Sequence, residues 1–202
     1  MQIWFFISLC GFIAILPLYF LSLEHLKLEG KYGERKAKRI GDVYGVISGW
    51  GFFLFWFGIW FSPQPRFTVP MFQALLIRLP GFNTAFSLLQ LAVFLPFFPV
   101  GAWLGIKGVA KTTLQVAETH RPVKVVTTGV YSVVRHPQYL GGLLAQVGFS
   151  FLLSGWYSLL STPLVVAVVY LISRKEETEL TREFGQEYLD YKRKTPMLLP
   201  KL

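Results

Sequence analysis

The feature that most constrains the fold of this chain is a set of long apolar stretches without any charged residue. Five such stretches, at residues 3–23, 43–61, 85–106, 138–154 and 156–173, contain no Asp, Glu, Lys or Arg. Most of them approach the ~20 residues that an α-helix needs to cross the hydrocarbon core of a bilayer. Because 53% of all residues are hydrophobic and only 15% are charged, an ordinary soluble domain is excluded. We therefore predict an all-α integral membrane helical bundle of about five transmembrane helices in the lipid bilayer.

The positions of the basic residues predict how this bundle is oriented. Segments 24–42, 107–137 and 174–202 hold six, five and seven of the 20 Lys and Arg residues, and only Arg66 and Arg78 lie elsewhere. Since short basic loops stay on the cytoplasmic side, we expect these three segments inside and the N-terminus outside. The net charge of +9 favours anionic lipid headgroups. No nucleic-acid-binding motif accompanies this charge, so nucleic acid is not an expected partner.

Two local features define the expected C-terminal half. Only Gly155 separates the fourth and fifth stretches, which predicts a tight helical hairpin that brings its His136 end beside its Arg174 end. Gly141 and Gly142 would either let another helix approach closely or leave room for a ligand, and both readings stay open. After the hairpin, residues 174–193 carry apolar positions at helical spacing among charges. This pattern predicts an amphipathic C-terminal helix on the cytoplasmic face.

The remaining features point to a single membrane domain without a metal site. Cys10 is the only cysteine and the three histidines share no ligand spacing, so we expect neither a disulfide nor a metal. Stretch 3–23 has no basic n-region and no cleavage site, so we expect it to remain as a span. Segment 62–80 is expected to be an extracytoplasmic loop, with room for a short interfacial helix at residues 71–79. No internal repeat occurs, and the sequence does not predict an oligomeric state.

Residues 125–142 contain several potentially functional side chains between apolar stretches of the sequence. Arg135 and His136 supply donors directly before Pro137, which sets the first turn of a helix. Such a helix start suits an anionic group. Glu176 and Glu177 follow the hairpin; taken alone they indicate a solvated helix start. Beside the His136 end of the hairpin, they are also candidates for binding a cationic group.

These residues together resemble a known family. The pattern is Lys124-Val125-Val126-x-x-Gly129-x-Tyr131-x-x-x-Arg135-His136-Pro137-x-Tyr139-x-Gly141, an apolar hairpin, Glu176-Glu177, Phe184-Gly185-x-Glu187-Tyr188-x-x-Tyr191 and Thr195-Pro196-x-Leu198-x-Pro200. Over about residues 107–202 the chain resembles the isoprenylcysteine carboxyl methyltransferase family. The wider superfamily also includes phospholipid N-methyltransferases, small-thiol methyltransferases and the C-terminal half of sterol reductases.

The resemblance implies an integral membrane methyltransferase that uses S-adenosylmethionine at the cytoplasmic end of the bundle. Residues 1–106 would then be a scaffold of three spans, and residues 107–202 the cofactor-binding core. His136 and the helix start would hold the cofactor carboxylate, Glu176 or Glu177 its ammonium, and Tyr131 and Tyr139 its adenosine. The expected cofactor-binding residues are Lys124, Val125, Val126, Tyr131, Arg135, His136, Tyr139, Gly141, Glu176 and Glu177.

The resemblance favours carboxyl O-methylation of a lipophilic, isoprenylcysteine-type acceptor. Phospholipid N-methylation and small-thiol S-methylation are alternatives, and a sterol-type reductase or a non-enzymatic membrane scaffold are more distant ones. In the family an arginine near the end of the last span helps hold the acceptor carboxylate. Here that position is Ile172, and the nearest arginine, Arg174, is displaced by two residues. Arg174 and Glu177 are the expected catalytic residues, with alignment and desolvation supplying most of the rate enhancement.

Overall fold

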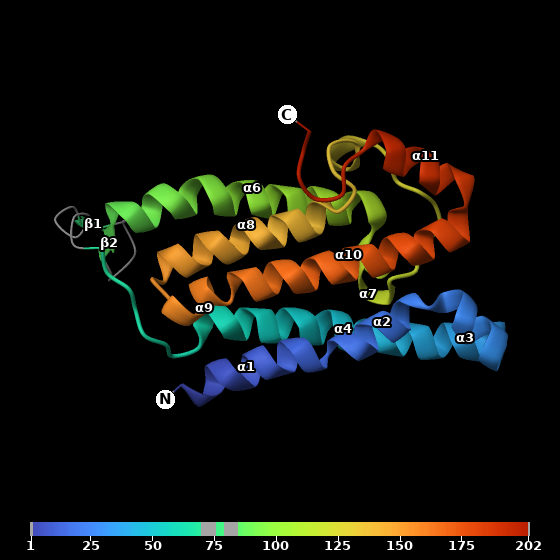
Figure 1. Cartoon of the computed structure of the whole chain (residues 1–202), viewed down its shortest axis with the longest axis horizontal. Coiled ribbons are helices and arrows are strands. Elements are labelled where there is room, and N and C mark those ends of the chain that lie inside the picture. The colour runs from blue at the N-terminus through green and yellow to red at the C-terminus, as the bar shows by residue number, and fades with distance from the viewer. Residues whose placement is uncertain (1, 70–75, 79–84, 202) are drawn as a thin grey trace.

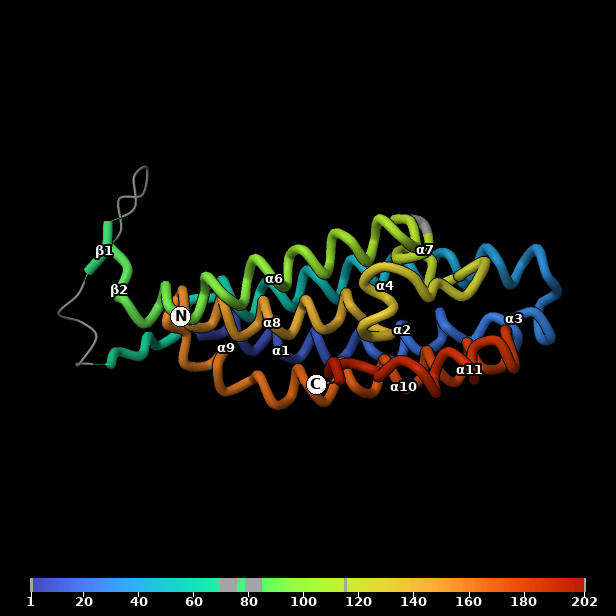
Figure 2. Tube along the Cα trace, turned by 90° about the horizontal axis from the view of Figure 1, so that it is seen from above, coloured from blue at the N-terminus to red at the C-terminus, as the bar shows by residue number. Residues whose placement is uncertain are grey.

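The computed structural model describes residues 2–69, 76–78 and 85–201 and is mostly helical. The elements in chain order are α1 (Ile3–Ala14), α2 (Leu16–Leu23), α3 (His25–Tyr32), α4 (Glu34–Phe61), β1 (Leu76–Arg78), β2 (Ala85–Ser87), α6 (Leu88–Thr112), α7 (Leu114–Thr119), the short 3-10 helix η1 (Gly129–Ser132), α8 (Pro137–Leu152), α9 (Trp156–Leu160), α10 (Thr162–Phe184) and α11 (Gln186–Lys194). The long helices run side by side, with α3 and α11 at one end and the two strands at the other (Figures 1 and 2).

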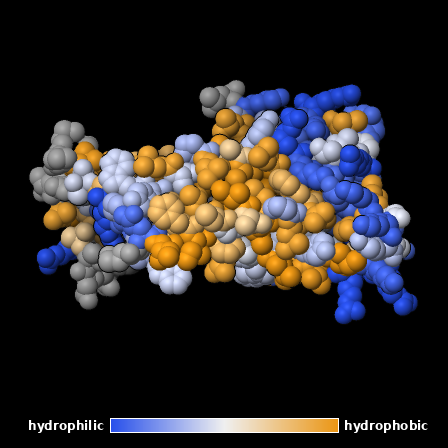
Figure 3. All heavy atoms as spheres, turned by 60° about the horizontal axis from the view of Figure 1, so that its bottom comes forward, coloured by the Kyte–Doolittle hydropathy of each residue, from blue (hydrophilic) through white to orange (hydrophobic). Residues whose placement is uncertain are grey.

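Three helical segments are long and apolar enough to cross a membrane: Ile3–Leu23, Glu34–Phe61 and Leu88–Thr112. Hydrophobic residues cover the middle of the bundle, and hydrophilic residues gather at the end that carries α3 and α11 (Figure 3). This arrangement is that of a helical integral membrane protein, as expected. The fourth and fifth expected spans are also helical, but α8 has only 16 residues and α10 continues from its apolar part into charged residues.

The boundaries of the first and third stretches differ from the prediction. Stretch 3–23 is interrupted at Ile15, where α1 ends and α2 begins with Pro17 in its first turn, a position that proline tolerates. The third stretch was expected to be helical from residue 85, but α6 begins at Leu88, because residues 85–87 pair with residues 76–78 in a two-stranded antiparallel sheet. The fold is therefore not purely α. The interfacial helix expected at 71–79 is wrong for residues 76–78, which form β1; its other residues lie outside the described ones.

Helices α6 and α8 pack against each other at glycines. A Cβ built on Gly141 would lie 2.5 Å from the carbonyl oxygen of Gly101, and a Cβ on Gly101 would lie 2.5 Å from that of Gly141. Neither position can hold a side chain, so Gly141 serves close helix approach. Gly142 is different: its missing Cβ would lie 2.6 Å from the Trp56 ring of α4. Absence of a side chain there lets the indole pack onto α8.

A buried glutamine links the helices around the hairpin. Gln146 of α8 is fully buried, and its Oε1 accepts from the indole N–H groups of Trp56 (2.8 Å) and Trp60 (2.5 Å). Its Nε2 donates to the carbonyl oxygen of Ser158 in α9 (2.7 Å). The side chain thus satisfies polar groups of three helices in an apolar interior, where an unpaired group would be costly. It fixes α4 against both arms of the predicted hairpin.

The C-terminal segment turns back on the bundle. α10 continues through Arg174 to Phe184 and ends at Gly185, whose φ of +55° suits a residue without a Cβ. The charged segment 174–193, expected as one helix, is therefore two. After α11 the chain lies along residues 135–137, here called the Arg-His-Pro loop. The backbone N–H of Arg135 donates to the carbonyl oxygen of Pro196 (2.9 Å), and that of His136 donates to the carbonyl oxygen of Met197 (3.1 Å).

Candidate functional site

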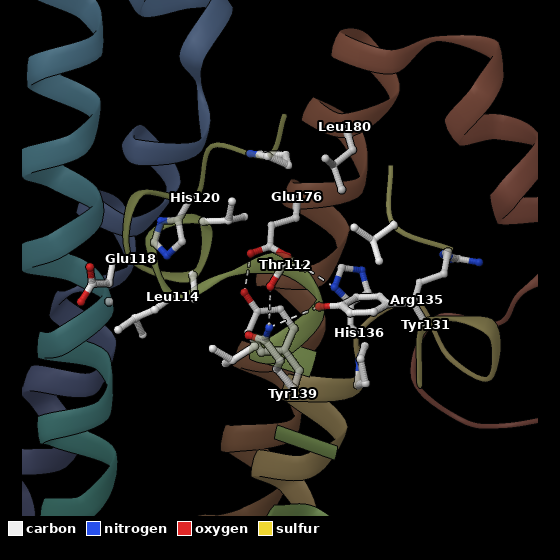
Figure 4. Close-up of a pocket in the computed structure, with 18 of the residues that line it drawn as sticks. Thr112, Leu114, Glu118, His120, Tyr131, Arg135, His136, Tyr139, Glu176 and Leu180 are labelled. Atoms are coloured by element: carbon white, nitrogen blue, oxygen red, sulfur yellow. Dashed lines mark hydrogen bonds and ion pairs between the residues drawn. The ribbon is translucent and has the colours of Figure 1, made fainter. Parts of the chain in front are cut away.

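A cavity of about 300 Å³ opens between the two halves of the chain. Its walls come from α2, α4, the end of α6, α7, segment 122–139, the start of α8, and α10 and α11; Figure 4 shows part of this lining. The expected site residues that line it are Lys124, Val125, Val126, Tyr131, Arg135, His136, Tyr139 and Glu176. Three expected residues do not line it: Gly141, Glu177 and Arg174.

Glu177 lies behind the cavity wall in a cluster of positive groups. Its Oε1 accepts from Arg135 Nε at 2.6 Å, and its Oε2 is 3.1 Å from Lys192 Nζ of α11. Arg135 also donates to the backbone carbonyl oxygens of Lys192 (3.1 Å) and Thr195. The Glu177 side chain is 3% exposed and that of Arg135 9%. This cluster therefore fastens α10 to both the Arg-His-Pro loop and the C-terminal segment.

His136 stands between the two glutamates. Its Nδ1 is 3.3 Å from Glu176 Oε2, and its Nε2 is 3.3 Å from Glu177 Oε1. Burial opposes protonation of this ring, but the two carboxylates outweigh burial and raise the pKa of His136. Burial would likewise raise the pKa of Glu177, yet His136 and Arg135 outweigh burial and lower it to about 2. At neutral pH, Glu177 is thus a carboxylate held by cations.

Glu176 instead faces the cavity, where two tyrosines contact it. Tyr139 of α8 donates to Glu176 Oε1, and the hydroxyl of Tyr19 lies 3.4 Å from the same oxygen. The two hydroxyls also lie 2.7 Å from each other. The His136 ring stacks on that of Tyr139 with centroids 5.5 Å apart. Glu176 is thereby held in place at the cavity, with Oε1 contacted by the two tyrosines and Oε2 by His136.

The two consecutive glutamates thus have different surroundings. Neighbouring positions on an α-helix point about 100° apart, so one side chain can face the cavity while the next faces the protein. Here Glu176 lines the cavity and Glu177 is bound to Arg135 and Lys192. The alternative interpretation, that both glutamates belong to a solvated helix start, does not agree with the structure, because the Glu176 and Glu177 side chains are only 18% and 3% exposed.

The other side of the cavity is formed around Tyr131. The Tyr131 hydroxyl accepts from Gln138 Nε2 (3.2 Å), and the backbone carbonyl of Tyr131 accepts from the Tyr191 hydroxyl (2.6 Å). Burial raises the pKa of Tyr131 to about 12, so its hydroxyl stays protonated. Val125 and Val126 border the same region, and Lys124 is an exposed cation at its edge. Within the described part of the chain, Lys124 has no ion-pair partner.

Arg174 and Ile172 lie apart from this site. Arg174 is exposed, and its guanidinium contacts Tyr170, one turn earlier on α10. Ile172, which occupies the family's arginine position, is completely buried in the apolar core. Neither side chain lines the cavity.

Several cavity residues were not anticipated from the sequence. Tyr19 comes from the first apolar stretch, Trp50, Phe53 and Trp56 from the second, and His120 from the loop before the motif. Trp50 and Phe53 lie at helical spacing, but in the sequence they look like ordinary lipid-facing side chains. No neighbouring residue marks Tyr19 as part of a site. Their role follows only from contacts across the fold.

Comparisons with known proteins agree with the resemblance in the sequence. Residues 91–187 match the family model described as phospholipid methyltransferase. The chain is similar to protein-S-isoprenylcysteine O-methyltransferase of Mus musculus, with 34% identity over 93 residues, covering 42% of this chain and 29% of that protein. For the Schizosaccharomyces pombe protein of the same name, identity is 29% over 134 residues, covering 61% and 56%. A methanethiol S-methyltransferase of Bradyrhizobium diazoefficiens is 40% identical over 73 residues, covering 36% and 27%.

The family-model match includes the cavity-lining motif residues from Lys124 to Glu176. The chain spans between about a quarter and just over half of the length of these relatives. No solved structure matches the chain. The match to the phospholipid methyltransferase model covers residues 91–187, and the similarity to these relatives confirms the resemblance to the isoprenylcysteine carboxyl methyltransferase family.

Proposed function

We propose that the protein is an S-adenosylmethionine-dependent membrane methyltransferase that acts on a lipophilic acceptor. The names of the relatives favour carboxyl O-methylation of an isoprenylcysteine-type acceptor. The observation that carries the proposal is the Glu176 carboxylate, fixed by Tyr139 and exposed to a cavity whose other walls are largely apolar and aromatic. A negative group in such a site favours a ligand with an ammonium and a sulfonium.

The residues present fit the chemical groups of this cofactor. Glu176 would accept from the ammonium, and Lys124 with the amides at the start of α8 would hold the carboxylate. Tyr131, Val125 and Val126 would surround the adenosine. His136 and Arg135 would set the shape of the loop, with Glu177 as the buried anchor that positions both. Gly141 would act by keeping α8 close to α6.

The bound cofactor would supply an electrophilic methyl group, and this chain would orient the acceptor and exclude water. A carboxylate acceptor carries its nucleophilic lone pair at neutral pH and needs no base, so alignment in a dry site is sufficient. Lys124, a cavity-lining cation at the edge of the site, can attract an acceptor carboxylate as well as that of the cofactor. Arg174 enters the proposal only as a surface cation near the expected membrane boundary.

We propose a five-span topology, with residues 138–154 and 156–173, the apolar parts of α8 and of α9–α10, as the fourth and fifth spans and the cavity at the cytoplasmic end. Trp50 and Phe53 line the cavity yet are 59% and 51% exposed on the outer face of α4. A lipophilic acceptor would enter sideways past these rings, because bringing its chain through water costs about 0.8 kcal/mol per methylene. The charged cofactor would enter from the cytoplasm.

A labelled-methyl transfer assay with the full-length protein in lipid vesicles tests the proposal. The acceptors are an isoprenylcysteine analogue with a free carboxylate, phosphatidylethanolamine and a small thiol. Transfer to the isoprenylcysteine analogue, at a rate that rises with prenyl chain length, is the expected result. Binding of NADPH without binding of S-adenosylmethionine would instead favour the reductase alternative. Binding of neither would leave a non-enzymatic role.

A further inference from the structure

His120 lies in the cavity wall, across from the motif residues. It follows α7 and lines the cavity, and Figure 4 shows Glu176 between it and the pair His136 and Arg135. Its ring stacks on that of Tyr19, with centroids 4.1 Å apart. The imidazole therefore belongs to the part of the cavity that the N-terminal helices form, opposite the loop proposed to hold the cofactor.

Ser22 determines which ring nitrogen of His120 carries the proton. The Ser22 hydroxyl lies 2.6 Å from the Tyr19 carbonyl oxygen and 2.7 Å from His120 Nδ1. A carbonyl oxygen only accepts hydrogen bonds, so the 2.6 Å contact requires the single hydroxyl proton. Ser22 Oγ must then accept from His120, and the neutral imidazole carries its proton on Nδ1.

The other ring nitrogen, Nε2, is left as an unprotonated acceptor. Across residues 2–69, 76–78 and 85–201 it has no hydrogen-bond partner. A Cβ built on Gly49 would lie 3.8 Å from Nε2, so this nitrogen faces α4 beside another residue that lines the cavity. Burial lowers the pKa of His120 to about 4, although the charge of Glu176 opposes this. The ring is therefore neutral at pH 7.

We propose that His120 Nε2 receives the acceptor proton when this cavity methylates a thiol. The inference rests on the proposed S-adenosylmethionine-dependent methyl transfer and assigns His120 a catalytic role toward one acceptor class. A thiol brings an S–H donor that the Nε2 lone pair accepts. A carboxylate brings no proton and makes no use of this lone pair.

The step is balanced without another reactant. The thiol sulfur forms a bond to the methyl carbon, while the bond from that carbon to the sulfonium breaks and leaves its electron pair on the departing sulfur. The S–H bond breaks with its electron pair remaining on the thiol sulfur, and the proton moves to Nε2. A sulfur that gains a methyl group while keeping its proton is a far stronger acid than an imidazolium, so a weakly basic nitrogen is sufficient. The proton then passes to water at the cavity mouth.

The test uses two acceptors with one alkyl chain, an alkanethiol and the alkanoic acid of equal length, in the labelled-methyl assay with full-length protein. His120→Asn keeps a polar group where Nδ1 meets Ser22 but has no atom at the Nε2 position. His120→Gln places an amide oxygen near that position. His25→Gln is the matched control, because among the described residues the His25 ring hydrogen-bonds to the backbone carbonyl of His120 alone (2.8 Å), and His25 does not line the cavity.

We expect the wild type to methylate the thiol and His120→Asn to lower the thiol-to-acid ratio of kcat/KM by about tenfold or more. His120→Gln should also lower that ratio, because an amide oxygen accepts an S–H hydrogen bond but is far too weak a base to keep the proton. His25→Gln should keep the ratio within about twofold of the wild type. A ratio that is equal in all four proteins, or transfer to the acid with none to the thiol, would overturn the role of His120. If no acceptor is methylated, including the isoprenylcysteine analogue, the proposed function itself fails, and the inference with it.

Discussion

Glu177→Gln should destabilise the folded protein, whereas Glu176→Gln should mainly weaken cofactor binding. Both substitutions preserve side-chain volume and remove one negative charge from adjacent positions of the same helix. They differ in surroundings, because Glu177 neutralises Arg135 and Lys192 behind the cavity wall and Glu176 faces the cavity. The pair therefore separates an anchor from a ligand-binding group.

The magnitude for Glu177 follows from its pKa. Lowering this pKa from its ordinary value of 4.5 to about 2 stabilises the folded protein by about 3 kcal/mol at neutral pH. Removing one partner of a buried ion pair lowers the free energy of unfolding by a similar ~3–5 kcal/mol. For chains of this size each kcal/mol changes the melting temperature by roughly 2–4 °C, so Glu177→Gln should melt roughly 6–12 °C lower.

The pH dependence has a defined sign. A carboxylate with a depressed pKa contributes its full stability above the unfolded-state pKa, near 4.5, and loses it as the pH falls toward 2. The melting temperatures of wild type and Glu177→Gln should therefore differ most above about pH 5 and converge as the pH falls below 4. Thermal unfolding in detergent from pH 7 to pH 3, followed by intrinsic fluorescence, measures this difference.

Glu176→Gln should melt close to the wild type but bind S-adenosylmethionine more weakly, by about 1.5–3 kcal/mol for a lost hydrogen bond to a charged group. This corresponds to roughly 10- to 150-fold in Kd, which isothermal titration can measure. Equal melting temperatures for the two variants, or cofactor affinity lost only in Glu177→Gln, would refute the division of roles between the glutamates.

Three further outcomes are expected. In a Cys10→Ala background, Thr68→Cys should react with an impermeant thiol reagent from outside intact cells and Lys36→Cys should not; the reverse would overturn the orientation. Tyr19→Phe removes a hydroxyl next to the cavity carboxylate and should weaken cofactor binding by roughly 2- to 10-fold in titration calorimetry; unchanged affinity would contradict that contact. Gln146→Leu leaves two buried indole N–H groups without an acceptor, at a cost of about 1–3 kcal/mol each, so a melting temperature equal to that of the wild type would show that this link is dispensable.

The apolar stretches predicted the helices well, because the backbone N–H and C=O groups of a segment in lipid must pair with each other, and a helix pairs them within the segment. Helix ends were predicted less well. α4 begins at Glu34 rather than residue 43, and α10 runs on to Phe184. Charged residues such as Lys, Arg and Glu are good helix formers, so a helix continues from lipid into water without a break. The change between apolar and charged residues therefore marks the expected membrane boundary but not the end of the helix.

The site was predictable in part. The short connection at Gly155 implied that Arg135 and His136 lie near the two glutamates, and their contacts agree with this. Which glutamate faces the cavity could not be read from the sequence, because it depends on how α10 is rotated against α8. Tyr19 and His120 were not anticipated for a similar reason. Their contacts join residues 157 and 98 positions apart and leave no local pattern.

The first two helical segments do more than hold the core in the membrane. Glu24, directly after α2, accepts from Lys175 of α10 at 2.6 Å, next to the cavity glutamate. On the other side of α2, Ser22 meets His120. α2 is thus fixed to both walls of the cavity, and this fixation places the Tyr19 hydroxyl within reach of Glu176. Since Tyr19 precedes residues 91–187, which match the family model, a helix outside the matched segment also shapes the cavity around Glu176.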